Sequence, residues 1–288
     1  MKFIRFCVVL SGLMSCTGLM ASEWTTPQAP FHVHGNTYYV GSRGLTALLI
    51  TSDAGHVLID GPMEENVAMI EANIRALGFR VEDVRMILNS HAHYDHAGGI
   101  ATLAKHSGAK VYASRASARM LKSGGDGAAD PQRGSLELYA PVAKVKRFRD
   151  GAQMRVGDVA LTAHLTPGHT PGSTTWTWRS CQDGQCLNLV YADSLTAAAS
   201  GSYRFSDPAH PERVADFRQG LKTIAALDCD VLITPHPEVS GFPERVARRD
   251  GGEPQALIDR EACSRYAEAA GKRLDARIAE EAAAKPKL

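Results

Sequence analysis

The residues best suited to chemistry lie in one short stretch, which reads HAHYDH from His91 to His96. Its imidazoles and its carboxylate are borderline-to-hard ligands, which favour zinc over copper(I) or an iron–sulfur cluster. In an extended loop, residues two apart point the same way, so His91 and His93 can meet at one metal ion while Asp95 and His96 face elsewhere. The pattern therefore predicts a metal centre and suits two ions better than one. The alternative is a solvated histidine-rich loop.

The motif lies on a connection between a strand and a helix. Residues 84–88 form an apolar run of strand length, and residues 100–106 predict a helix that ends at Ser107 and Gly108. Asp95 is placed to cap that helix and so to fix the direction of the loop. A merely solvated loop would not explain this position at the end of a buried strand.

Two more histidines stand where predicted strands give way to loops. His169 lies in a turn that two Pro-Gly pairs stiffen, and His236 lies between two prolines directly after the apolar run 230–234. Either histidine alone would be more typical of a structural role. Together with the motif, these ligand-type residues at several strand ends predict one shared metal centre.

The rest of the chain predicts strands and helices in two halves of similar order. The expected strands are 37–40, 45–50, 56–60, 84–88, 110–113 and 230–234, with mostly strands between 144 and 191. The expected helices are 62–77, 100–106, 114–122, 210–227 and 254–284, the last ending in the solvated charges Glu280 and Glu281. This order suggests two sheets packed face to face with helices outside.

Residues 123–141 form a long irregular segment between two predicted elements. They hold Gly, Asp, Pro and Ser in a dense run. Such a segment is more often functional or mobile than structural, so it is a candidate wall of the substrate cleft. A disordered surface loop is the plain alternative.

Length and composition exclude several classes of protein. The chain has 288 residues, 44% of them hydrophobic and 22% charged, which is enough for one large domain with a substantial core. The formal net charge is +1, so there is no excess of basic residues for nucleic acid or an anionic membrane. We expect a monomer whose partner is a small molecule.

The first 21 residues predict a signal peptide. A basic start and a short apolar stretch precede Ala21, a small residue at the expected cleavage point. Cleavage there would leave a single catalytic domain, residues 22–288, in the periplasm. Lipid anchoring through Cys16 is the alternative. No later segment is apolar enough to cross a bilayer, so stable membrane insertion is not expected.

Four cysteines remain after the predicted signal peptide. An even number of cysteines in an exported chain indicates disulfides. Cys181 and Cys186 flank a predicted hairpin tip, where a local bridge fits, and this leaves Cys229 to pair with Cys263. Zinc binding is the alternative, although the spacing matches no common zinc-finger pattern.

The HAHYDH motif, together with His169 and His236, resembles the metallo-β-lactamase superfamily over most of the predicted mature chain. More narrowly, the segments 36–41, 166–170, 191–196 and 235–238 are similar to the third subclass of di-zinc β-lactamases. The resemblance implies an α/β fold, an αββα sandwich of two mixed sheets with outer helices and with the metals at one edge. A superfamily motif alone does not fix the substrate.

The resemblance also implies roles for single residues. One of two Zn²⁺ ions would be held by His91, His93 and His169, and the other by Asp95, His96 and His236. Asp95 would in addition orient a zinc-bridging hydroxide that attacks the β-lactam carbonyl. Ser194 would hydrogen-bond near the second zinc, and Thr196 would help to bind the substrate carboxylate. Ordinary hydrogen bonding within a loop is the alternative for both.

These implications predict a zinc-dependent β-lactamase that hydrolyses penicillins, cephalosporins and carbapenems and so confers antibiotic resistance. The orientation of Asp193 distinguishes a β-lactamase from the main alternative, a hydrolase of lactones or thioesters. Many relatives of that kind bridge their two metals with an aspartate from a similar segment. If Asp193 points between the metals, hydrolysis of lactones or thioesters is favoured; if it turns away and bonds the backbone, β-lactam hydrolysis is favoured. A zinc-binding protein without catalysis is a third possibility.

Overall fold

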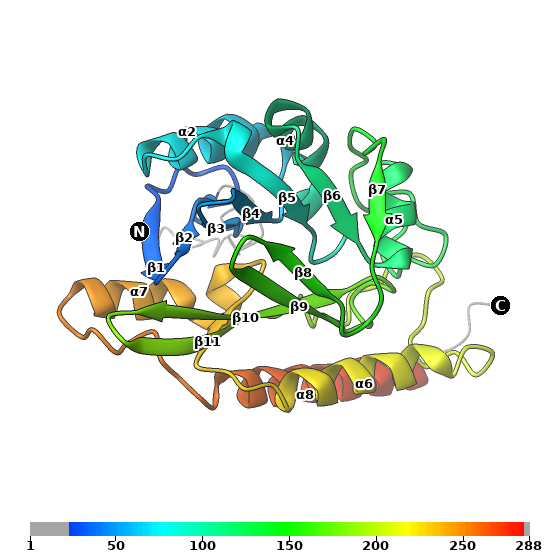
Figure 1. The fold of residues 1–288 in the computed structure, drawn as a ribbon. Coiled ribbons are helices and arrows are strands. Elements are labelled where there is room, and N and C mark those ends of the chain that lie inside the picture. The colour runs from blue at the N-terminus through cyan, green and yellow to red at the C-terminus, as the bar shows by residue number, and fades with distance from the viewer. Residues whose placement is uncertain (1–22, 285–288) are drawn as a thin grey trace, which may run out of the picture.

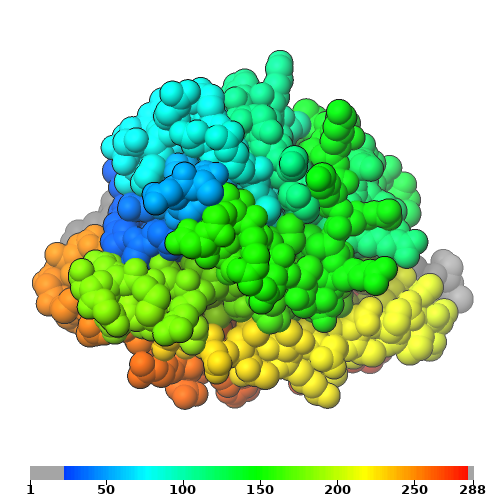
Figure 2. Space-filling view, in the orientation of Figure 1, coloured from blue at the N-terminus to red at the C-terminus, as the bar shows by residue number. Residues whose placement is uncertain are grey.

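The computed structural model describes residues 23–284 in four layers, with helices, two sheets and helices in that order (Figure 1). This is the αββα sandwich that the resemblance implied. The predicted signal peptide and Cys16 lie outside the described residues. A space-filling view shows side chains filling the space that separates the layers in the ribbon (Figure 2).

The first sheet has seven strands in chain order. They are β1 (Phe31–His34), β2 (Thr37–Tyr39), β3 (Leu48–Ile50), β4 (His56–Ile59), β5 (Val84–Leu88), β6 (Lys110–Ala113) and β7 (Val145–Arg147). The pairs from β1 to β4 are antiparallel, and those from β4 to β7 are parallel. The sheet is therefore mixed.

The second sheet has five strands in the order β12-β11-β10-β9-β8. They are β8 (Gln153–Val156), β9 (Val159–Leu165), β10 (Thr174–Gln182), β11 (Gln185–Tyr191) and β12 (Val231–Ile233). Neighbours are antiparallel except β11 and β12, which run parallel. This sheet is also mixed, as expected.

Alternating side chains build the layers. In β4, Val57 and Ile59 face the core between the sheets, whereas Leu58 packs toward the outer helices. In β11, Tyr191 faces the same inner core and Val190 packs outward. Because both faces of these strand segments are covered, residues 57–59 and 189–191 are apolar at every position.

Helices cover the outer face of each sheet. Those on the first sheet are α2 (Val67–Ala76), α4 (Ile100–Ser107) and α5 (Arg115–Lys122), and those on the second are α6 (Glu212–Ala225) and α8 (Ala262–Ala283). The remaining helices are α3 (Tyr94–Ala97), α7 (Phe242–Asp250) and the 3₁₀ turns η1 (Glu64–Asn66), η2 (Val81–Asp83) and η3 (Pro237–Ser240). None of the helices within residues 23–284 combines the length and apolarity that crossing a bilayer requires.

Several predicted boundaries were wrong. The last helix begins at Ala262 and not at residue 254, because the preceding turns carry Leu257 into the inner core. Helix α7 was not predicted. Asp95 does not cap a helix, since His93 is the N-cap residue of α3 and Asp95 lies within its first turn.

Both predicted disulfides are present. Cys181 and Cys186 pair at the tip of the β10–β11 hairpin, with an S–S distance of 2.04 Å. Cys229 and Cys263 join the segment before β12 to the start of α8, with an S–S distance of 2.06 Å. The four sulfurs are therefore not available to a metal.

Candidate metal centre

Ligand-type side chains from both sheets meet at one edge of the sandwich. His91 and His93 follow β5, Asp95 and His96 lie in α3, His169 lies between β9 and β10, and His236 follows β12. All six had been predicted to converge, and all six do.

Hydrogen bonds between the sheets hold this edge together. The Thr46 N–H and hydroxyl donate to the carbonyls of Pro235 (2.9 Å) and Thr234 (2.8 Å), which fixes the segment before His236. The Thr174 N–H donates to the Ser90 carbonyl (2.9 Å), next to His91. Because Thr46 bonds to the second sheet, residues 45–47 do not extend β3 as the sequence had predicted.

Asp60 shapes the start of the motif loop from beneath. Its carboxylate accepts hydrogen bonds from the Ser90 N–H (2.7 Å), the Ser90 hydroxyl (2.6 Å) and the Tyr191 hydroxyl (2.8 Å). Burial raises the pKa of Asp60 to about 7, against the opposing effect of these donors. This role of Asp60 was not predicted, because the only signal in the sequence is an aspartate at the end of a strand.

Three buried histidines form the first group. One ligand atom from each of His91, His93 and His169 lies within 4.8 Å of the others. Each ring has one nitrogen bound to the protein, with partners Asp193 for His91 Nδ1 (2.8 Å), Asp130 for His93 Nε2 (3.0 Å) and the Thr196 carbonyl for His169 Nδ1 (2.8 Å). The other nitrogen of each ring remains for the site.

One further observation supports metal binding by the first group. His91 Nε2 is buried and has no hydrogen-bond partner among the described residues. A buried polar atom left unpaired costs about 1–3 kcal/mol. A cation at this point would remove that cost.

The second group is tighter. His96 Nε2 lies 3.1 Å from Asp95 Oδ2 and 3.1 Å from His236 Nε2, and His236 Nε2 lies 3.2 Å from Asp95 Oδ2. Ligands of one tetrahedral zinc ion are about 3.4 Å apart, given its bond lengths. The ring centroids of His91 and His96 are 4.5 Å apart, so the two groups adjoin.

The electrostatics keep four of the six ligand-type side chains in forms that bind cations. Burial, reinforced by neighbouring imidazoles, lowers the pKa of His169 to about 3 and that of His91 well below its usual value. Burial alone would raise the pKa of Asp95, but His96 and His236 hold it well below its usual range. His91, His96 and His169 are thus neutral and Asp95 is ionised at neutral pH, as metal ligation requires. His236 differs, because burial alone would lower its pKa but the hydrogen bond and charge of Asp95 raise it.

Asp193 is turned toward the back of the first group. It is fully buried, burial raises its pKa, and it accepts the Nδ1–H of His91. Among the described residues, neither group of ligand atoms includes Asp193. It therefore turns away from the ligand nitrogens toward His91, and a hydrogen bond from the Ser194 backbone also acts on its carboxylate.

The two predicted substrate residues follow Asp193 in the chain. Ser194 is buried, and Thr196 is exposed with its carbonyl bonded to His169. Because Asp193 and Thr196 each contact a histidine of the first group, Ser194 is held between two points beside the centre. The sequence had not assigned a role to the Thr196 backbone.

Trp24 packs against the second group. Its ring centroid lies 5.5 Å from that of His236 and 6.1 Å from that of Tyr94. The neighbouring backbone is fixed, since the Gly44 N–H donates to the Glu23 carbonyl (3.1 Å). The beginning of the described chain therefore forms part of the site's surroundings.

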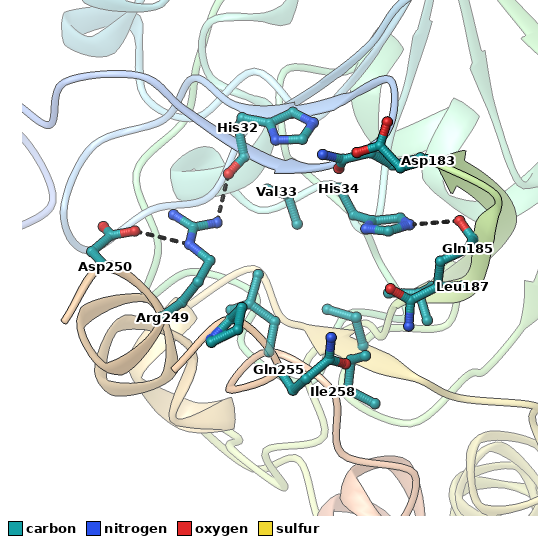
Figure 3. A pocket seen from close by; sticks show the side chains of 14 residues that line it. His32, Val33, His34, Asp183, Gln185, Leu187, Arg249, Asp250, Gln255 and Ile258 are labelled. Atoms are coloured by element: carbon teal, nitrogen blue, oxygen red, sulfur yellow. Dashed lines mark hydrogen bonds and ion pairs between the residues drawn. The ribbon is translucent and has the colours of Figure 1, made fainter. Parts of the chain in front are cut away.

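A separate cavity of about 550 Å³ contains two histidines that are hydrogen-bonded within the protein (Figure 3). It lies beside the tip of the β10–β11 hairpin, roughly 24 Å along β10 from its first residue. His32 and His34 there bond the carbonyls of Gly35 (2.7 Å) and Gln185 (3.3 Å), and Arg249 pairs with Asp250 (2.9 Å). These polar side chains are satisfied by the protein itself.

Comparison with known proteins agrees with this geometry. The family model of the metallo-beta-lactamase superfamily matches residues 40–236, which extend from the first sheet to the last histidine of the centre. The chain belongs to the metallo-beta-lactamase superfamily.

Within this superfamily, similar solved structures include two metallo-beta-lactamases. The Rm3 metallo-beta-lactamase is 49% identical, with 92% of this chain and 98% of that chain covered and a TM-score of 0.88. MEM-A1, a subclass B3 enzyme from a soil metagenome library, is also 49% identical, with 91% and 100% covered and a TM-score of 0.88.

More distant superfamily members carry another name. A hydroxyacylglutathione hydrolase of Anaeromyxobacter dehalogenans is 32% identical over 52% of this chain, which spans 47% of that protein. A second, from Acidiphilium cryptum, is 27% identical over 92% of this chain and 90% of its own length. The superfamily thus includes proteins named for different substrates.

Proposed function

We propose that this metallo-beta-lactamase superfamily member is a monomeric, zinc-dependent β-lactamase that opens the lactam amide of penicillins, cephalosporins and carbapenems. The observation that carries the proposal is the similarity, at 49% identity over almost the whole chain, to metallo-beta-lactamases of known structure. The orientation of Asp193 toward His91 supports it further, because the lactonase and thioesterase alternative was tied to an aspartate between the metals.

The ligand assignment follows the two groups. His91, His93 and His169 would hold one Zn²⁺ ion, and Asp95, His96 and His236 would hold the other. Supporting this assignment are the unpaired Nε2 of His91 and the separations of 3.1–3.2 Å in the second group. Two zinc ions would supply a nucleophile from water near neutral pH and would stabilise charge on the lactam.

Residues of the protein would orient the reacting water, hold the histidine rings and bind the substrate. Asp95, ionised and part of the second group, can accept a hydrogen bond from the reacting water and so orient it. Asp193, Asp130 and the Thr196 carbonyl hold the histidine rings in place. Ser194 would hydrogen-bond near the second zinc and Thr196 would help to bind the substrate carboxylate, since their segment borders the centre.

The deciding experiment is imipenem hydrolysis by the purified protein, with and without a chelator. We expect hydrolysis that stops when the metal is removed and returns when zinc is added. Hydrolysis that persists after complete metal removal would disprove the proposal. Tight zinc uptake without turnover of any β-lactam would instead support a zinc-binding protein.

A thioesterase is the second candidate, and the hydroxyacylglutathione hydrolases favour it. The same preparation should be assayed with a hydroxyacylglutathione at equal concentration. If the thioester were turned over orders of magnitude faster than imipenem, this candidate would replace the first.

A further inference from the structure

The loop of residues 123–141 contacts the metal centre at two points. Asp130 accepts the Nε2–H of His93 (3.0 Å), and the Tyr139 hydroxyl donates to the Ala92 carbonyl (2.7 Å). Both contacts fall on the short stretch from His91 to His93. The loop is therefore hydrogen-bonded to the stretch that carries the ligand-type histidines. The alternative of a disordered surface loop is not what the structure shows.

The Asp130 carboxylate is built into this position. Its side chain is only 2% exposed, and its second oxygen accepts the Gln132 N–H (2.8 Å). The Asp130 N–H donates to the Gly127 carbonyl (2.9 Å), which closes the loop into a compact turn. A carboxylate buried to this degree needs a hydrogen-bonding partner, and His93 is that partner.

The contact determines which nitrogen of His93 carries the proton. An ionised carboxylate can only accept hydrogen bonds, so the proton of a neutral His93 must be on Nε2. The lone pair is then on Nδ1, the nitrogen left to join His91 and His169.

On its other side, the same loop is hydrogen-bonded to the segment that follows Thr196. The Ser200 N–H donates to the Pro131 carbonyl (2.9 Å), and the Ser200 hydroxyl donates to the Arg133 carbonyl (3.1 Å). Asp130 thus lies between a metal-ligand histidine and the segment that carries Thr196.

We propose that Asp130 is a positioning residue that fixes the tautomer of His93 for metal binding and, through the same contact, fastens loop 123–141 beside the centre. This inference rests on the proposed function for its choice of zinc. It predicts that zinc affinity and the order of the loop depend together on one carboxylate.

The first test measures zinc affinity without substrate. The purified full-length mature chain is freed of metal and titrated with Zn²⁺ against a chromophoric chelator. In Asp130→Asn the amide oxygen would keep the Gln132 N–H, so the amide N–H would face His93 Nε2 and favour the proton on Nδ1. We therefore expect zinc binding to weaken by roughly 10- to 100-fold. Asp130→Glu, which keeps an acceptor, should recover part of this loss.

The matched control is Asp126→Asn in the same loop. Asp126 is exposed and pairs with Arg133 (2.9 Å). We expect its zinc affinity to change by less than about twofold, because exposed ion pairs contribute little. Thermal unfolding of each metal-free variant verifies that it is folded before its affinity is compared.

The second test measures amide hydrogen exchange in residues 123–141. Zinc should slow exchange there in the parent and in Asp126→Asn, but much less in Asp130→Asn. A folded Asp130→Asn variant with parental zinc affinity, or an equal loss in Asp126→Asn, would overturn the proposal. If β-lactam hydrolysis were absent and the affinity loss present, the proposed function would fail while this inference would stand.

Discussion

Each histidine of the first group divides its two ring nitrogens between the protein and the site. His91 is bonded to a buried carboxylate, His93 to a loop carboxylate and His169 to a backbone carbonyl. Such outer partners fix the ring orientation and increase the basicity of the inner nitrogen. The precision of the centre therefore depends on residues outside the HAHYDH motif.

Replacing a histidine of the centre should abolish function, whereas replacing its near neighbour should not. We expect His169→Ala to lower kcat/KM for imipenem by more than about 100-fold, since loss of a ligand costs more than loss of its outer partner. The control is His164→Ala, because His164 bonds Thr177 (2.8 Å) on the adjacent strand, away from the centre. Steady-state kinetics and zinc content of both variants test this, and equal losses would contradict it.

The role of Glu281 was not predicted from the sequence. It was expected to be solvated, but it is 5% exposed and accepts hydrogen bonds from the Phe205 N–H (3.1 Å) and the Ser206 N–H (2.8 Å). Burial alone would raise its pKa, but these donors and Arg277 lower it to about 2. The ionised carboxylate thus ties the end of α8 to the segment beyond Thr196.

This contact makes a pH-dependent contribution to stability. Because the pKa of Glu281 is lowered from 4.5 to about 2 on folding, its contribution is complete above pH 4.5 and is lost as the pH falls toward 2. We expect Glu281→Gln to reduce the free energy of unfolding by about 3 kcal/mol at pH 6, and by less at pH 3.

Urea unfolding at both pH values provides the measurement. Exposed Glu280→Gln is the control and should match the parent at each pH. A difference between parent and Glu281→Gln that grew on acidification would show that the sign is wrong.

Residue types and spacing were enough to predict that six ligand-type side chains meet, but not which residues support them. The histidines can be recognised in the sequence because several ligand-type residues occur together at strand ends. Asp60, Asp130 and Glu281 are single acidic residues in unremarkable surroundings. Their roles arise from contacts with residues 30, 37 and 76 positions away, which no local pattern encodes.

At the scale of elements, the sequence predicted best where apolar runs are buried on both faces. Strands β4, β5 and β12 lie within their predicted ranges because their neighbours impose the pattern. Prediction failed where a distant partner decides the outcome. Residues 45–47 bond to the segment after β12, and residues 254–261 form turns that fill the open end of the inner core.

The two disulfides should differ in their effect on stability. Cys229–Cys263 closes a separation of 34 residues and Cys181–Cys186 one of 5. From the chain entropy of the unfolded state, we expect paired Cys→Ser replacement to cost about 4 kcal/mol for the long loop and about 2 kcal/mol for the short one. Denaturant unfolding of the two double variants measures the free energy of unfolding that each loses. A larger loss for the Cys181–Cys186 variant would contradict this prediction.

For the whole molecule, we propose export with cleavage after Ala21. The basic start and the short apolar stretch that precede Ala21 support this proposal. Intact mass of the periplasmic protein should match residues 22–288, and Cys16→Ser should change neither mass nor location. A lipid-modified product that depends on Cys16 would establish anchoring instead.

The position of Trp24 has a practical consequence for anyone who produces this protein. Since its ring lies beside His236, a polyhistidine tag fused immediately ahead of Glu23 would bring foreign imidazoles next to the native ligands, where they could compete for the same ions. A cleavable fusion, or a tag placed after α8, keeps such donors away and allows metal counts to be attributed to the enzyme alone.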